Sequence, residues 1–98
     1  MILTRENIKQ VVQDYFKDKP VSKVYLFGSY ARGNANENSD VDIIFSLIEN
    51  TRISYFGLAG YVVDLEKKFS KNVDLIEDKF IFPEIKEQIN KEKILLLN

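Results

Sequence analysis

Cysteine and histidine are absent from the 98-residue chain. Their absence excludes disulfide bonds, cysteine nucleophiles, zinc sites built on thiolate or imidazole, and every mechanism that uses imidazole as its base. Any chemistry must therefore come from carboxylates, hydroxyls, lysines and arginines, and from a metal ion that prefers oxygen ligands.

Long apolar runs and an excess of either charge are also missing. The longest apolar runs, such as 94–97, are only about four residues, whereas a membrane span needs about 20. The 14 basic and 15 acidic side chains leave a net charge of -1 and are evenly spread, so no basic region indicates a nucleic-acid partner. The first ten residues carry charge where a secretory signal has its apolar centre, so we expect a cytoplasmic protein.

The remaining composition is that of a globular protein. The chain is 45% hydrophobic and 30% charged, which is enough apolar material for a modest core. Its length accommodates one compact domain, so we expect a single domain over residues 1–98.

Hydrophobic periodicity predicts alternating helices and strands. Ile8, Val12 and Phe16 recur at the spacing of one helical face, whereas Val41, Ile43 and Phe45 alternate as in a strand. The pattern therefore favours an α/β (α+β) fold in which helices cover one face of a small mixed β-sheet. The predicted elements are helix 4–17, strand 21–27, a helical turn after it, loop 33–39, a strand from 40, helix 54–69, strand 73–76, a helix from 83 and strand 94–97.

Three weaker features have more than one interpretation. The apolar segments 80–82 and 94–97 are expected in the core rather than at an interface. Lys67, Lys68 and Lys71 are typical of a solvated helix end that complements the helix dipole. Tyr30 either contacts a ligand or packs inside the protein.

The turn after the first strand carries residues suited to binding phosphate. Gly28 allows a sharp exit from the strand and a close approach of backbone to ligand. Ser29 begins a helical turn, where its hydroxyl and free N–H groups can hold phosphate oxygens. Arg32, one turn later, can add a charge-assisted contact to the same anion.

Carboxylates follow on the next two strands. Asp40 and Asp42 are two residues apart, so on one strand both side chains leave the same face about 6.5–7 Å apart. If the strand at 73–76 pairs with theirs, Asp74 lies beside them. Three such carboxylates repel one another unless a cation is present, and their hard oxygen atoms suit Mg²⁺.

Each of these features also has an ordinary structural explanation. An Asp-x-Asp pair at a strand edge is commonly a solvated face, and Gly-Ser after a strand is commonly a simple turn. Their occurrence in order, each in the expected local context, favours a metal and phosphate site.

These residues resemble a known family. The segment Gly28-Ser29-Tyr30-Ala31-Arg32-Gly33, a polar loop and Ser39-Asp40-Val41-Asp42-Ile43 are similar to the signature of minimal nucleotidyltransferases in the polymerase beta superfamily. The later Asn72-Val73-Asp74-Leu75-Ile76 resembles that family's third-carboxylate strand.

The resemblance implies a nucleotidyltransferase fold and a set of roles. Asp40, Asp42 and Asp74 would be catalytic and would ligate two Mg²⁺ ions, with Asp74 also serving as general base. The nucleotide ATP would be held by the remaining motif residues Gly28, Ser29, Arg32 and Ser39.

It also implies a biological partner. Family members of this size are often antitoxins paired with a HEPN-domain toxin encoded nearby, and some transfer AMP from ATP to a toxin hydroxyl, with tyrosine the expected acceptor. A hetero-oligomer with the toxin is therefore expected. Two hypotheses remain open: an enzyme that modifies its partner, or a non-catalytic antitoxin that binds the toxin and occludes it.

Overall fold

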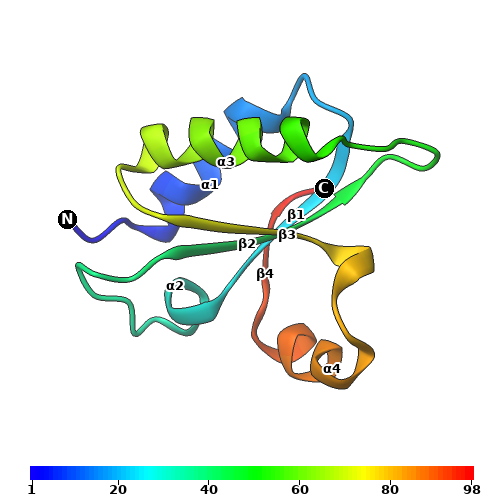
Figure 1. The fold of residues 1–98 in the computed structure, drawn as a ribbon. Coiled ribbons are helices and arrows are strands. Elements are labelled where there is room, and N and C mark those ends of the chain that lie inside the picture. Colours follow the sequence, from blue (N-terminus) through cyan, green and yellow to red (C-terminus); the bar gives the residue numbers. More distant parts are fainter.

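The computed structural model describes all residues 1–98 as a four-stranded sheet with helices on both sides. Its strands lie in the order β3-β2-β1-β4, in which β1 is antiparallel to β2 and β4 while β2 is parallel to β3. The elements are α1 (Arg5–Phe16), β1 (Val21–Phe27), α2 (Gly28–Arg32), β2 (Val41–Leu47), α3 (Tyr55–Phe69), β3 (Val73–Glu77), η1 (Asp78–Phe80), α4 (Pro83–Glu92) and β4 (Ile94–Leu97). The predicted mixed sheet is thus confirmed, whereas the prediction that helices cover one face holds only for the two long helices, because α2 and α4 follow strand ends on the other side (Figure 1).

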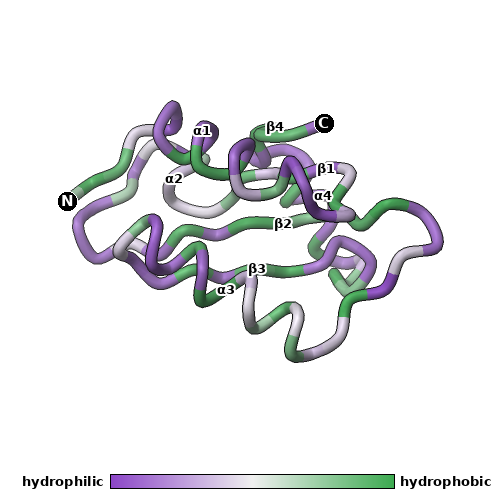
Figure 2. The backbone as a smooth tube through the Cα atoms, turned by 90° about the horizontal axis from the view of Figure 1, so that it is seen from above, coloured by the Kyte–Doolittle hydropathy of each residue, from purple (hydrophilic) through white to green (hydrophobic).

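The long helices α1 and α3 cover one face of the sheet, and the shorter α2 and α4 lie on its other side (Figure 1). The core fills the space between the sheet and the long helices, and Figure 2 shows the apolar residues following the central strands β1 and β2. No helix is long and apolar enough to cross a membrane. The core is built from Ile8, Val12 and Phe16 of α1, Val24 and Leu26 of β1, Val41, Ile43 and Phe45 of β2, and Leu65 and Phe69 of α3, among others.

The two long helices begin at capping side chains. Thr4 Oγ1 accepts a hydrogen bond from Asn7 N at 3.0 Å, and Ser54 Oγ accepts one from Gly57 N at 2.9 Å. These contacts satisfy N–H groups that have no partner within the helix. Both predicted helices are confirmed to within one residue at each end.

The apolar segment before α4 is less buried than we expected. Ile81 is buried and so is Leu96 in β4, but Phe80 and Phe82 are 69% and 72% exposed. The prediction that 80–82 belongs to the core is therefore wrong for both phenylalanines. The reason is local: η1 turns the chain after β3, so only the middle residue of the three faces inward.

The five-residue α2 is held in place by a side chain from α1. Arg5 donates hydrogen bonds from Nε to Tyr30 O at 3.2 Å and from Nη2 to Ala31 O at 2.6 Å. A cation at these carbonyls also complements the helix dipole. The Tyr30 side chain is buried and its hydroxyl accepts from Leu3 N at 3.4 Å, so this tyrosine packs.

We predict that Arg5→Gln lowers the free energy of unfolding by about 1 kcal/mol, because the charge-assisted bonds to α2 are lost. That loss corresponds to a fall in the thermal midpoint of about 4–8 °C for a chain of this size. Arg52→Gln is the matched control, since Arg52 is exposed and takes part in no ion pair. Equal melting curves for the two variants would show that Arg5 does not hold α2.

Candidate active site

The parallel pairing of β2 and β3 brings two of the predicted site residues together. Asp42 is the register partner of Asp74, which confirms the expected pairing of their strands. Val41 and Ile43, on either side of Asp42, are fully buried in the core beneath α1 and α3. Since side chains alternate along a strand, Asp42 points to the opposite face of the sheet.

Asp40 lies just outside the strand that was predicted to carry it. β2 begins at Val41, so Asp40 belongs to the end of the preceding loop and is exposed. Its negative charge still contributes to raising the pKa of Asp42. The structure therefore brings three carboxylates to one end of the sheet, with only Asp42 and Asp74 on strands.

The electrostatics of Asp42 reflect this crowding. The pKa of the Asp42 carboxyl is raised to about 6, chiefly by burial and then by the negative charges of Asp74 and Asp40. Arg32 acts in the opposite direction and lowers the pKa of Asp42. The site thus has an excess of negative charge that a bound cation would offset.

Gly28 brings the end of β1 directly against this carboxylate. Phe27 is the register partner of Asp42, and Gly28 follows with φ +73°, a conformation that favours glycine. A Cβ atom on Gly28 would overlap Asp42 Oδ2. Glycine is therefore required here both by its backbone angle and by the approach of the carboxylate, and Ser29 follows in the first turn of α2.

Arg32 has a partner that the sequence did not indicate. Its Nη1 atom forms an ion pair at 3.4 Å with Oε2 of Glu92, at the end of α4. The two residues are 60 positions apart, so no local pattern pointed to the contact. Arg32 is thus paired with Glu92, and its charge also lowers the pKa of Asp42.

Ser39 has a structural part in the loop before β2. Its Oγ accepts a hydrogen bond from Asn36 N at 2.8 Å, and its N–H donates to Asn36 O at 3.1 Å. These two bonds close the turn that leads to Asp40. A contact between Ser39 and nucleotide stays a prediction.

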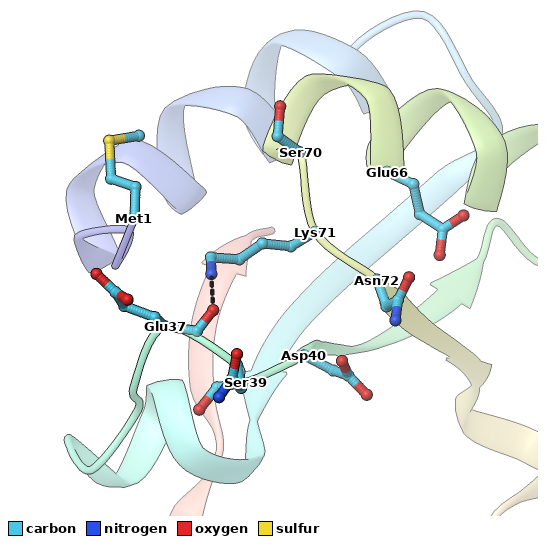
Figure 3. Close-up of a pocket in the computed structure, with 9 residues that line it drawn as sticks. Met1, Glu37, Ser39, Asp40, Glu66, Ser70, Lys71 and Asn72 are labelled. Carbon is cyan, nitrogen blue, oxygen red and sulfur yellow. Dashed lines mark hydrogen bonds between the residues drawn. The ribbon is translucent and has the colours of Figure 1, made fainter.

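A polar cavity of about 500 Å³ opens beside Asp40 (Figure 3). It lies between the loop before β2 and the end of α3, and Met1 is its single apolar lining residue. Sequence reasoning did not identify Glu66 or Asn72 as site residues, and it placed Lys71 at a solvated helix end. The lining residues are Met1, Glu37, Asn38, Ser39, Asp40, Glu66, Ser70, Lys71 and Asn72.

The carboxylate set fits Mg²⁺ in its chemistry. The available ligand atoms are hard carboxylate oxygens, and the pKa of Asp42 is raised by burial first and then by the neighbouring carboxylates. No three acidic side chains converge closely enough to enclose an ion. That Asp40, Asp42 and Asp74 ligate metal remains a prediction.

Comparison with known proteins identifies the family. Residues 5–96 match the family described as the nucleotidyltransferase domain. The chain belongs to the nucleotidyltransferase family. A Methanocaldococcus jannaschii protein named as a candidate protein adenylyltransferase is 38% identical over 87 residues, which cover 88% of this chain and 84% of the relative. Another such protein from the same organism is 35% identical and covers 74% and 87% of the two chains.

Solved structures confirm the nucleotidyltransferase fold. A structure described as a minimal nucleotidyltransferase superposes with a TM-score of 0.76 at 26% identity, covering 94% of this chain and 95% of the other. A Shewanella oneidensis complex of a tri-AMPylated HEPN toxin with its MNT antitoxin superposes with a TM-score of 0.74 at 17% identity, over 98% and 73% of the chains. This nucleotidyltransferase therefore has the sheet topology of the minimal members of its family.

We predict that Asp42→Asn stabilises the metal-free protein. An acid whose folded pKa, about 6, exceeds its usual value of 3.8 binds its proton more tightly when folded. The stability gained from that proton is complete below about pH 4 and is lost as the pH rises through 6. In EDTA at pH 7.5 the variant should melt about 4–8 °C higher, a solvent-screened effect of about 1 kcal/mol.

The gain should disappear at pH 4, where Asp42 is protonated. Adding Mg²⁺ with ATP should raise the midpoint of the wild type by ligand linkage but leave that of the variant nearly unchanged. Glu49→Gln, at an exposed acidic position away from the site, is the control. A variant that melts lower in EDTA and responds fully to Mg²⁺-ATP would make Asp42 a structural residue.

Proposed function

We propose that this nucleotidyltransferase is a Mg²⁺-dependent protein adenylyltransferase that transfers AMP from ATP to a hydroxyl, with tyrosine the expected acceptor, of a partner HEPN toxin. In this role it acts as the toxin's antitoxin. The observation that carries the proposal is the register of Asp42 with Asp74, directly against the turn at Gly28.

The relatives support the same reaction. The curated proteins of M. jannaschii are named as candidate protein adenylyltransferases. Similar folds occur in a toxin–antitoxin complex with AMP-PNP and in the complex that contains a tri-AMPylated HEPN toxin. This set supports a nucleoside triphosphate as donor and a protein as acceptor.

In this proposal some residues bind the nucleotide and the metal ion, and Asp74 accepts a proton. The turn at Gly28 and the Ser29 hydroxyl would hold the phosphates, with Arg32 and Ser39 assisting. Arg32 would release Glu92, since an exposed ion pair at 3.4 Å contributes little stability. Asp40, Asp42 and Asp74 would hold Mg²⁺, which when bound would neutralise phosphate charge and act as a Lewis acid.

Transfer proceeds by in-line displacement at the α-phosphorus. The acceptor oxygen forms a bond to that phosphorus as the bond to pyrophosphate breaks. Asp74 accepts the proton of the acceptor hydroxyl. A tyrosine hydroxyl has a pKa near 10, so it needs such a base at neutral pH, and the chain has no histidine to serve instead.

We predict that the protein, incubated with ATP, Mg²⁺ and its HEPN partner, increases the intact mass of the partner by one or more AMP units. The double variant Asp40→Ala, Asp42→Ala should abolish this increase, because the metal ligands are removed. Intact-mass spectrometry measures the result, and Glu49→Ala should modify the partner as the wild type does. Modification by the double variant would refute the ligand assignment.

An occluding antitoxin is the second candidate, and the exposed apolar surface favours it. Tyr55 and Phe56 at the start of α3 are 87% and 88% exposed, and Phe80 and Phe82 are exposed as well. Aromatic side chains of this kind are enriched at protein interfaces. Binding of the toxin through such a surface would not need the carboxylates.

We predict that Asp40→Ala, Asp42→Ala still binds the toxin but no longer protects cells from it. The two carboxylates contribute little apolar contact, so co-purification with the toxin should persist. Survival of cells that express the toxin at normal antitoxin levels is the measurement. Full protection by the double variant would make stoichiometric occlusion the better explanation.

A further inference from the structure

We propose that Arg5 is a positioning residue of the nucleotide site. It fixes α2, and thereby holds the turn at Gly28 and Ser29 at the distance from the carboxylates at which ATP binds. This inference rests on the proposed function, because it takes that turn as the part of the chain that holds the phosphates of ATP. Arg5 contacts the other end of α2, so it acts without touching the nucleotide.

The helix α2 depends on support from outside itself. It has only five residues, and a helix of this length is unstable on its own. Its N-cap residue, Phe27, makes no side-chain hydrogen bond to the first turn. The helix also lies on the opposite side of the sheet from α1 and α3, which enclose the core (Figure 1). Contacts with residues distant in the sequence must therefore fix the place of its first turn.

Arg5 supplies directional contacts of this kind. Its guanidinium group donates from Nε to Tyr30 O at 3.2 Å and from Nη2 to Ala31 O at 2.6 Å. Two bonds from one planar group to two successive carbonyl oxygens fix the helix in rotation as well as in position. The buried side chains of Tyr30 and Ala31 add apolar contact, which is not directional.

The Arg5 guanidinium group has no other partner in the protein. It takes part in none of the ion pairs, and its hydrogen bonds all go to the backbone of α2. A Cβ atom on Gly33, the C-cap of α2, would lie 3.6 Å from Arg5 Nη2, so the group lies against the end of the helix. An exposed arginine used in this way is suited to orienting the helix.

The position of α2 matters because its first turn is closely fitted to a strand that carries a carboxylate. A Cβ atom on Gly28 would overlap Asp42 Oδ2, so the turn has little room to move toward β2. Movement in the other direction would widen the gap between Ser29 and the carboxylates, and a triphosphate with its metal ion has to contact both. A misplacement of about 1 Å can cost about a hundredfold in rate. Loss of Arg5 should therefore weaken nucleotide binding although no group that touches the nucleotide is removed.

The test measures the Kd of Mg²⁺-ATP by titration calorimetry and the KM values for ATP and for the HEPN partner in AMP transfer. All measurements are made well below the melting midpoint of each variant. Arg5→Gln should raise the Kd and the KM for ATP about tenfold, while the KM for the partner stays within about twofold. Arg5→Lys keeps the cation but has one nitrogen where Arg5 uses two, so its increase should be smaller.

Ser54→Ala is the control matched for stability. It removes the N-cap of α3, where Ser54 Oγ accepts from Gly57 N at 2.9 Å, and it should lower the melting midpoint about as much as Arg5→Gln does. Ser54 makes no hydrogen bond to α2 or to the carboxylates. Its loss should therefore leave the Kd and both KM values within about twofold of those of the wild type.

The outcomes separate this inference from the proposed function. An Arg5→Gln variant that melts lower but keeps the wild-type Kd would refute the positioning role, and so would an equal loss of nucleotide binding in Ser54→Ala. An equal rise in the KM for the partner would also refute it, because the effect would then extend beyond the nucleotide turn. If the wild type binds Mg²⁺-ATP but transfers no AMP to the partner, the proposed function is wrong, and the Kd values still decide the role of Arg5. If the wild type binds no Mg²⁺-ATP, both are wrong.

Discussion

The parallel pairing of β2 with β3 is the constraint on which the site depends. It places Asp42 and Asp74 opposite each other on neighbouring strands, where like charges are destabilising. The fold holds them there because the residues that alternate with them, Val41, Ile43 and Val73, are buried in the core. Slipping one strand by a single residue would bury the carboxylates and expose these side chains, so the hydrophobic face fixes the position of the charged one.

The same register explains the close approach of the glycine turn. β1 ends with Phe27 opposite Asp42, so the first residue after the strand must pass the carboxylate. Only a residue without a Cβ atom fits at Gly28, and its positive φ starts α2 on that face of the sheet. Arg5 then secures α2 from the other end through two backbone carbonyl groups. A phosphate-binding turn and a carboxylate pair are thereby built by neighbouring strands and kept together by the core.

Local periodicity was sufficient to predict most of this architecture. Alternation along β2 identified the face of Asp42, and glycine after an apolar strand identified the turn at Gly28. It could not show that Asp40 lies outside the strand, because hydrogen bonding with β1 and β3, not side-chain pattern, decides where β2 begins. The partner of Arg32 and the lining of the cavity depend on segments far apart in the chain. The exposure of Phe80 depends on the direction in which η1 turns the chain. The number of apolar residues in a segment does not predict that direction.

The cations around the site share one property that links the fold to ligand exchange. Arg32 is held by the half-buried carboxylate of Glu92 at 3.4 Å, and Lys71 by a single carbonyl oxygen at 2.9 Å. Contacts of this kind contribute about 1 kcal/mol or less, so an anionic ligand can replace either at small cost. The repulsion between Asp42 and Asp74 cannot be relieved in that way, because the buried residues next to them in the sheet hold both carboxylates in place. Stability therefore resides in the apolar face, while the polar end of the sheet exchanges weak internal partners for its ligands.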